Sequence, residues 1–167
     1  MVSWDEHKSV LDAGGGNGIL LKQLLKNYPH LEAVLIELPE VINQIPEKEK
    51  NQERINYIGK DFFTPWNVSA DAIIFSRVLH DWPDHLALAL LERAKQSLTS
   101  EGKIYVIEMI VDQNSPRGGL LDLNMFVMTG GCERTLQDWK SLFAKANLNL
   151  SKTIELSTIV SILELTA

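Results

Sequence analysis

The stretch Val10-Leu11-Asp12-Ala13-Gly14-Gly15-Gly16-Asn17-Gly18 decides the fold of this chain of 167 residues. The apolar run at Ser9–Ala13 predicts a short strand, and the glycines that follow predict a tight loop leading into a helix. Residues 19–28 then place four leucines at helical spacing, and Pro29 ends that helix. A strand, a glycine loop and a helix in this order are typical of the first unit of an α/β fold.

Apolar runs and helical patterns alternate along the rest of the chain. Strands are predicted at residues 33–36, 55–58, 72–75 and 104–110. The helix between the last two of these carries five apolar residues at helical spacing, namely Leu86, Leu90, Leu91, Ala94 and Leu98. The last three strands are apolar on both faces, which favours a parallel sheet covered by helices on both sides.

The end of the chain has a different pattern. A helix predicted at residues 136–146 is followed by two β-rich runs, 148–156 and 158–165, with no room for another helix between them. These two runs should form an antiparallel pair. We therefore expect an α/β fold, with a Rossmann-like, doubly wound, mostly parallel seven-stranded sheet that ends in an antiparallel hairpin, as one domain spanning residues 1–167.

Composition excludes several classes of partner. The formal net charge is -6 and no Lys/Arg-rich run is present, so we expect neither nucleic acid nor a membrane surface as a partner. No apolar run approaches the ~20 residues of a spanning helix. The single cysteine, Cys132, cannot form an internal disulfide, and the first ten residues lack the features of a signal peptide, which predicts a cytoplasmic protein.

The glycine loop narrows the choice of ligand. A phosphate-binding P-loop would need Lys after its last glycine, and a dinucleotide fingerprint starting at Gly14 would need Gly at position 19, but Ile19 occupies that place. The remaining pattern, D-x-G-x-G-x-G from Asp12 to Gly18, resembles motif I of S-adenosylmethionine-dependent methyltransferases. A glycine turn without any ligand is the alternative interpretation.

Acidic residues end three successive predicted strands. Asp12, Glu37 and Asp61 should therefore meet at the edge of the sheet where ligands bind in open α/β folds. Glu37 could accept hydrogen bonds from two ribose hydroxyls, and Asp61 could accept one from an adenine amino group. Any one of these acids alone is more often a solvated strand end.

A histidine and an aspartate stand together just after the fourth predicted strand, in Ser76-Arg77-Val78-Leu79-His80-Asp81-Trp82-Pro83-Asp84. A general base would be expected at this position. The alternative is a helix entry with Pro83 in its first turn and an ordinary loop histidine.

Five motifs occur in order, namely VLDAGGGNG (10–18), IELPEVI (36–42), GKDFF (59–63), SRVLHDWPD (76–84) and GGCERT (130–135). Over nearly the whole chain they resemble the caffeic acid and acetylserotonin type of small-molecule O-methyltransferases. The resemblance implies transfer of a methyl group from S-adenosyl-L-methionine to a hydroxyl of a small, aromatic or polyketide-like molecule. It implies S-adenosyl-L-homocysteine as the product and no metal.

The resemblance also implies site residues. His80 would remove the proton of the acceptor hydroxyl, with Glu108 and Glu133 holding its ring and Asp81 beside it. The implied cofactor-binding residues are Asp12, Gly14, Gly16, Gly18, Glu37, Leu38, Asp61, Phe62, Ser76 and Arg77. The segment 120–129 is by its apolar pattern a core helix, but in the family the matching helix lines the acceptor pocket, which implies substrate contacts for Met125, Phe126, Met128 and Thr129.

Members of this family usually carry N-terminal helices that dimerise and close over the acceptor pocket, whereas this chain begins almost at its first strand. We expect an excised catalytic domain or a naturally short form, with a homodimer only where the N-terminal domain is present. Two other functions stay open. The chain could use S-adenosylmethionine structurally for decarboxylation or hydroxylation, or it could be a cofactor-binding remnant without turnover.

Overall fold

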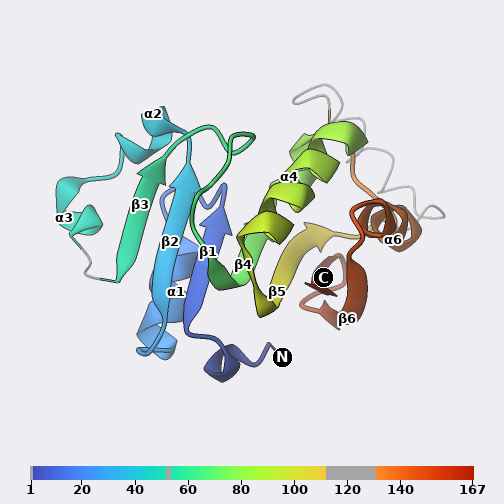
Figure 1. The fold of residues 1–167 in the computed structure, drawn as a ribbon, viewed down its shortest axis with the longest axis horizontal. Coiled ribbons are helices and arrows are strands. Elements are labelled where there is room, and N and C mark those ends of the chain that lie inside the picture. Colours follow the sequence, from blue (N-terminus) through green and yellow to red (C-terminus); the bar gives the residue numbers. More distant parts are fainter. Residues whose placement is uncertain (1, 52–53, 112–130) are drawn as a thin grey trace.

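One seven-stranded sheet forms the centre of the computed structural model, which describes residues 2–51, 54–111 and 131–167 (Figure 1). The strand order is β3-β2-β1-β4-β5-β7-β6. β1 to β5 pair in parallel, whereas β7 is antiparallel to both β5 and β6. The predicted fold class, including the antiparallel hairpin at the end, is confirmed. The strands are β1 (Ser9–Ala13), β2 (Glu32–Glu37), β3 (Ile55–Gly59), β4 (Ala70–Ser76), β5 (Leu98–Met109), β6 (Asn149–Glu155) and β7 (Val160–Thr166).

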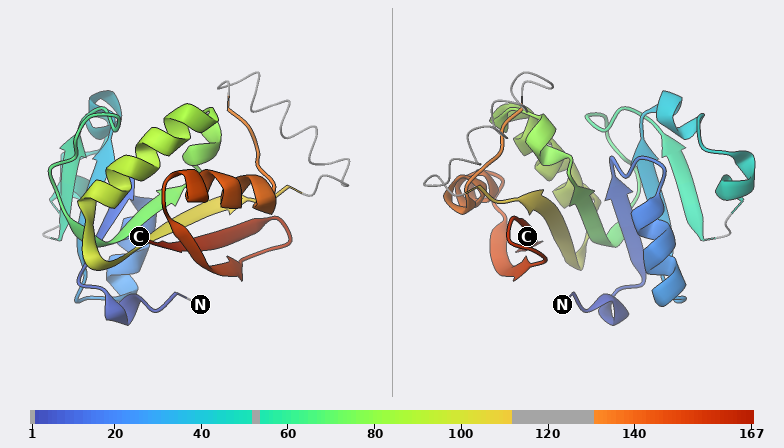
Figure 2. Two further views of the ribbon diagram at one scale, coloured as in Figure 1. Left: turned by 45° about the vertical axis from the view of Figure 1, so that its right-hand side comes forward. Right: turned by 180° about the vertical axis from the view of Figure 1, so that it is seen from behind.

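Helices cover both faces of this sheet. α4 lies over one face beside α6, and α1 lies over the opposite face, as the front and rear views show (Figures 1 and 2). No helix in the described ranges is long and apolar enough to cross a membrane. The helices are η1 (Trp4–Glu6), α1 (Ile19–Asn27), α2 (Pro39–Ile42), α3 (Glu47–Lys50), η2 (Leu79–Asp81), α4 (Asp84–Ser97) and α6 (Leu136–Lys145).

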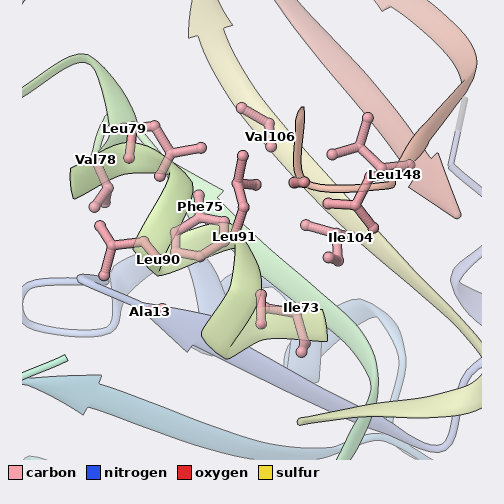
Figure 3. Close-up of a cluster of buried hydrophobic side chains, with 14 of the residues drawn as sticks. Ala13, Ile73, Phe75, Val78, Leu79, Leu90, Leu91, Ile104, Val106 and Leu148 are labelled. Atoms are coloured by element: carbon pink, nitrogen blue, oxygen red, sulfur yellow. The ribbon is translucent and has the colours of Figure 1, made fainter. Parts of the chain in front are cut away.

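The central strands build two hydrophobic cores because successive side chains of a strand point to opposite faces. In β4, Ile73 and Phe75 pack in the core under α4 and α6, whereas Ile74 packs in the core under α1. Figure 3 shows the first of these cores, where Phe75 and Ile73 face Leu90 and Leu91 of α4. Because both faces of β4 are buried, its sequence has to be apolar at successive positions, as the sequence predicts.

Two elements differ from their predicted form. β3 is an edge strand, so only Ile55 is buried and the expectation of two covered faces fails there. β5 begins at Leu98, six residues before the predicted start, because Leu98 adopts an extended backbone that ends α4. Leu98 therefore belongs to the strand rather than to the helix, and the pairing with β4 shifts register between Ala70 and Ala72.

The carboxyl ends of β1 to β5 meet along one edge of the sheet because these strands are parallel. The segment that begins at Gly131 reaches this edge through backbone hydrogen bonds. Cys132 N donates to His80 O at 2.9 Å, and Val111 N donates to Arg134 O at 3.2 Å. These bonds bring Glu133 beside Glu108, although 25 positions of sequence separate them.

Candidate active site

The glycine loop joins β1 to α1 and has the conformation that a ligand-binding turn needs. Gly14, Gly16 and Gly18 all have positive φ angles, which L side chains rarely adopt. Gly14 also packs directly against the loop that carries His80, since a Cβ at Gly14 would lie 2.8 Å from Cγ2 of Val78. The loop and the histidine segment are therefore in contact.

Asp12 is the most unusual polar residue of this loop region. It is 1% exposed, and neither of its carboxylate oxygens has a hydrogen-bond partner within the described ranges. Burial, and then the negative charge of Glu37, raise the pKa of Asp12 to about 7. A buried carboxylate without donors is costly, so Asp12 is suited to a cationic or strongly donating ligand group. This unpartnered carboxylate fits the amino group of an amino-acid-like cofactor.

Glu37 holds the glycine loop in place. It is the last residue of β2 and is buried, with Oε2 accepting from Gly16 N at 3.0 Å and Oε1 accepting from Leu38 N at 2.8 Å. Each carboxylate oxygen has a further lone pair, so these two bonds leave acceptor capacity for ligand hydroxyls.

The remaining residues predicted to bind the cofactor lie in different environments. Asp61 is exposed, and its Oδ1 accepts from Phe63 N at 2.9 Å, which fixes the turn after β3. Phe62 is 8% exposed and packs in the core under α4. Ser76 is half-buried at the end of β4.

His80 lies in η2, buried, with its ring held from one side. Its Nδ1 lies 3.1 Å from Oε1 of Glu133, and its Nε2 lies 3.5 Å from Oδ1 of Asp81. Glu133 is an ionised acceptor, because hydrogen bonds from His80 and Arg77 lower its pKa despite the opposing effect of burial. Nδ1 must then carry a proton, and Nε2 presents its lone pair when the ring is neutral. Burial lowers the pKa of His80, but the hydrogen bond to Glu133 and the charge of Glu108 outweigh it and raise the pKa above its ordinary value.

Glu108 supports the same histidine through the backbone. The residue is fully buried, and its Oε1 accepts from Val78 N at 3.1 Å and from His80 N at 3.3 Å. The resemblance implies that Glu108 and Glu133 both hold the imidazole ring, but the structure gives the ring contact to Glu133. Glu108 is instead the acceptor that fixes the turn carrying His80. Burial raises the pKa of Glu108 to about 7, against the opposing charges of His80 and Arg77.

Arg77 joins the two acids. Its Nη1 lies 2.9 Å from Oε2 of Glu108, and its Nη2 lies 2.8 Å from Oε1 of Glu133. The resemblance implies a place for Arg77 along the cofactor, whereas the structure turns its guanidinium toward this acidic pair. His80, Glu108 and Glu133 also place one ligand atom each within 4.8 Å of one another, but Arg77 already bonds both acids there.

Sequence reasoning missed Arg134. It is 2% exposed and donates to Leu79 O at 3.0 Å, to Trp82 O at 2.9 Å and to Asp84 Oδ1 at 2.9 Å, while its guanidinium carbon lies 4.9 Å from the ring centre of Trp139. Arg134 thereby fixes both ends of the turn that carries His80. No local pattern marks this function, because the groups that accept its hydrogen bonds are about 50 positions away in sequence.

The four residues predicted to contact the acceptor, Met125, Phe126, Met128 and Thr129, lie outside the described residues. Their predicted role stays a prediction.

Comparisons with known proteins agree on one family. A family model described as an O-methyltransferase domain matches residues 2–149. Norreticuline-7-O-methyltransferase of Papaver somniferum is 35% identical over 158 residues, which cover 92% of this chain and 43% of that protein. The chain therefore spans about half the length, or less, of the relatives that it matches.

Solved structures of similar enzymes superpose closely on the fold. The mitomycin 7-O-methyltransferase has a TM-score of 0.91 at 26% identity, covering 98% of this chain and 50% of its own. An O-methyltransferase from neocarzinostatin biosynthesis, in complex with S-adenosylmethionine and 2-hydroxy-5-methyl naphthoic acid, has a TM-score of 0.87 at 32% identity, covering 99% of this chain and 50% of its own. The glycine loop, the His80 turn and these matches agree, and the chain belongs to the O-methyltransferase domain family.

Proposed function

We propose that this chain transfers a methyl group from S-adenosylmethionine to a hydroxyl of a small aromatic molecule, with His80 as the general base. The observation that carries the proposal is the buried pair of His80 and Glu133, in which Glu133 contacts Nδ1 and the turn of His80 lies against the glycine loop, so that Nε2 would accept the proton. The relatives support the aromatic acceptor, since the neocarzinostatin enzyme binds a hydroxylated naphthoic acid.

The residues around the glycine loop would hold the cofactor. Asp12 would accept from the amino group of its methionine portion beside Gly14, and Glu37 would accept from the ribose hydroxyls beside Leu38. The turn at Asp61 and Phe62 and the end of β4 at Ser76 would lie along the adenosine. When bound, S-adenosylmethionine supplies an electrophilic methyl group on a sulfonium.

The chain's own contribution to the chemistry is orientation and proton acceptance. A phenol has a pKa of ~10 and histidine one of ~6.5, so complete proton transfer before methylation would cost roughly 5 kcal/mol. Nε2 of His80 would therefore take the proton as the new bond forms. Glu133 would stabilise the resulting imidazolium through Nδ1, at a distance of 3.1 Å.

Two wider features belong to the same proposal. We place the reaction in the cytoplasm, where a chain with one cysteine needs no disulfide. We expect a homodimer only when additional N-terminal helices accompany the domain.

The test is a labelled-methyl assay with a panel of phenols. His80→Ala should lower methylation by about 10²–10⁴-fold while leaving cofactor binding intact, because the base acts only on the acceptor. His85→Ala is the matched control, since His85 is exposed on α4. Undiminished methylation by His80→Ala would refute the base. Cofactor binding by the unaltered chain without any product would refute methyl transfer and favour a binding remnant.

A further inference from the structure

Arg77 has a backbone conformation that an ordinary strand end does not require. Its φ angle is 56°, in the left-handed region that residues other than glycine rarely adopt. The hydrogen bond from Arg77 N to Ile107 O, at 3.0 Å, holds this conformation against β5. The strained backbone directs the side chain toward Glu108 and Glu133 instead of along the strand.

Within the described ranges, the guanidinium is the counter-charge of a cluster of acids around one imidazole. Glu133 bonds the ring of His80, Glu108 bonds its backbone, and Asp81 lies 3.5 Å from Nε2. Arg77 is the charged group among these neighbours whose sign opposes protonation of the ring. Its two ion pairs, at 2.9 and 2.8 Å, neutralise part of the acidic field.

The charge matters because a general base must be neutral before it accepts a proton. Burial opposes protonation of the ring, but the hydrogen bond to Glu133 and the charge of Glu108 outweigh it and raise the pKa of His80 above its ordinary value, and Arg77 limits that rise. Without Arg77 the pKa of His80 would be higher still. The geometry of Glu133 depends on the same arginine, because Nη2 and the histidine Nδ1 share its Oε1.

We propose that Arg77 is a positioning residue that fixes Glu133 and supplies the positive charge keeping the imidazole of His80 able to accept a proton. The functional half of this inference rests on the proposed role of His80 as base. The electrostatic half concerns the protonation of His80 in the chain alone, and it can be measured without any reaction.

The experiment is an NMR titration of the histidine rings without cofactor or acceptor, with the His80 signal assigned by its loss in His80→Gln. Arg77→Gln should shift the titration of His80 upward by about one pH unit or more. Arg77→Lys keeps the positive charge and should titrate close to the unaltered protein. An unchanged His80 titration in Arg77→Gln would overturn the proposal.

A second comparison covers the case in which Arg77→Gln does not fold. Glu108→Gln removes one buried acid and keeps an oxygen for the backbone donors of Val78 and His80. In that background, adding Arg77→Gln should again raise the His80 titration, and equal titrations would overturn the proposal. Because no methyl transfer is measured, failure of the proposed function would appear in the labelled-methyl assay and not here.

Discussion

The carboxylate of Asp12 is buried at the end of β1, and its pKa is raised to about 7 by burial and by Glu37. Its ordinary value is 3.8, so between about pH 4 and pH 7 the folded chain binds a proton that the unfolded chain does not. Stability therefore falls as the pH rises through this window. Asp12→Asn removes this titration, and its stability relative to the unaltered chain should improve by about 2–4 kcal/mol between pH 4 and pH 8, measured by urea unfolding.

Asp71 offers a control of opposite sign for that measurement. Hydrogen bonds from the backbone of Lys8 and from Thr99 lower its pKa, although burial opposes them. The ionised carboxylate of Asp71 therefore stabilises the fold at pH values above its ordinary pKa, and this stabilisation is lost as the pH falls and the carboxylate is protonated. Asp71→Asn should therefore be less stable than the unaltered chain at pH 8. A loss of relative stability in Asp12→Asn on going from pH 4 to pH 8 would contradict the burial argument.

The same carboxylate predicts a pH-dependent affinity for the cofactor. A cationic amino group binds the ionised form of Asp12, so the affinity for S-adenosylmethionine should increase from pH 6 to pH 7, below the pH of about 8 at which an α-amino group loses its charge. Asp12→Asn should lose at least about tenfold in affinity, because a partner of a buried charge is removed. Calorimetry at several pH values measures both effects, and an affinity that falls over this range would contradict the assignment.

Residue positions differ in how far the sequence predicts them. Asp12 and His80 follow from motifs, because a strand end followed by a turn fixes where their side chains lie. The direction of Arg77 does not follow, since it depends on a positive φ angle at a non-glycine residue. The division of roles, with Glu133 on the ring of His80 and Glu108 on its backbone, depends on backbone bonds to a distant segment, such as Cys132 N to His80 O. Local pattern carries no information about those bonds.

At the scale of elements, hydrophobic periodicity predicts the sheet well because the alternation in β4 fills two cores at once. Hydrophobic periodicity predicts less well at the edge of the sheet and at the ends of its strands. β3 has an apolar sequence at Ile55 and Ile58, yet strand order makes it an edge. β5 starts at Leu98 because this residue has an extended backbone. Its helical spacing from the preceding leucines predicts a helix residue instead.

The turn of η2 depends on Arg134, which precedes α6. Thr135 begins that helix with a capping box to Asp138, so Arg134 is held at a fixed helix entry. Arg134→Met would leave the carbonyls of Leu79 and Trp82 without this donor. We expect a loss of about 2–4 kcal/mol in unfolding free energy, with faster amide exchange in residues 78–82.

Lys140→Met, on the exposed face of α6, is the matched control for this variant and should change stability by less than about 0.5 kcal/mol. Arg134→Lys keeps the charge but not the fork of donors, so we expect an intermediate loss. If Arg134→Met unfolds like the control and its amides in residues 78–82 exchange at the original rate, the role assigned to Arg134 is wrong.

At the scale of the whole molecule, the chain holds the glycine loop and the His80 turn but spans less than half of norreticuline-7-O-methyltransferase. Exposed apolar side chains remain on its surface, with Ile19 60% exposed directly after the glycine loop and Leu156 56% exposed. Water that reaches a reaction site weakens its electrostatic interactions. We therefore expect these 167 residues to bind the cofactor, but we do not expect rapid turnover from them.

We expect the isolated chain to bind S-adenosylmethionine but to turn over slowly, at a rate well below the roughly 1 s⁻¹ that marks the slow end of ordinary enzymes. Calorimetry measures the binding, and label transfer to phenols under single-turnover conditions measures the rate. A cooperative urea transition under the same conditions shows that slow turnover does not arise from unfolding. Turnover at ordinary enzymatic rates would contradict this expectation, because it would mean that the described sheet and loops already exclude water well enough for catalysis.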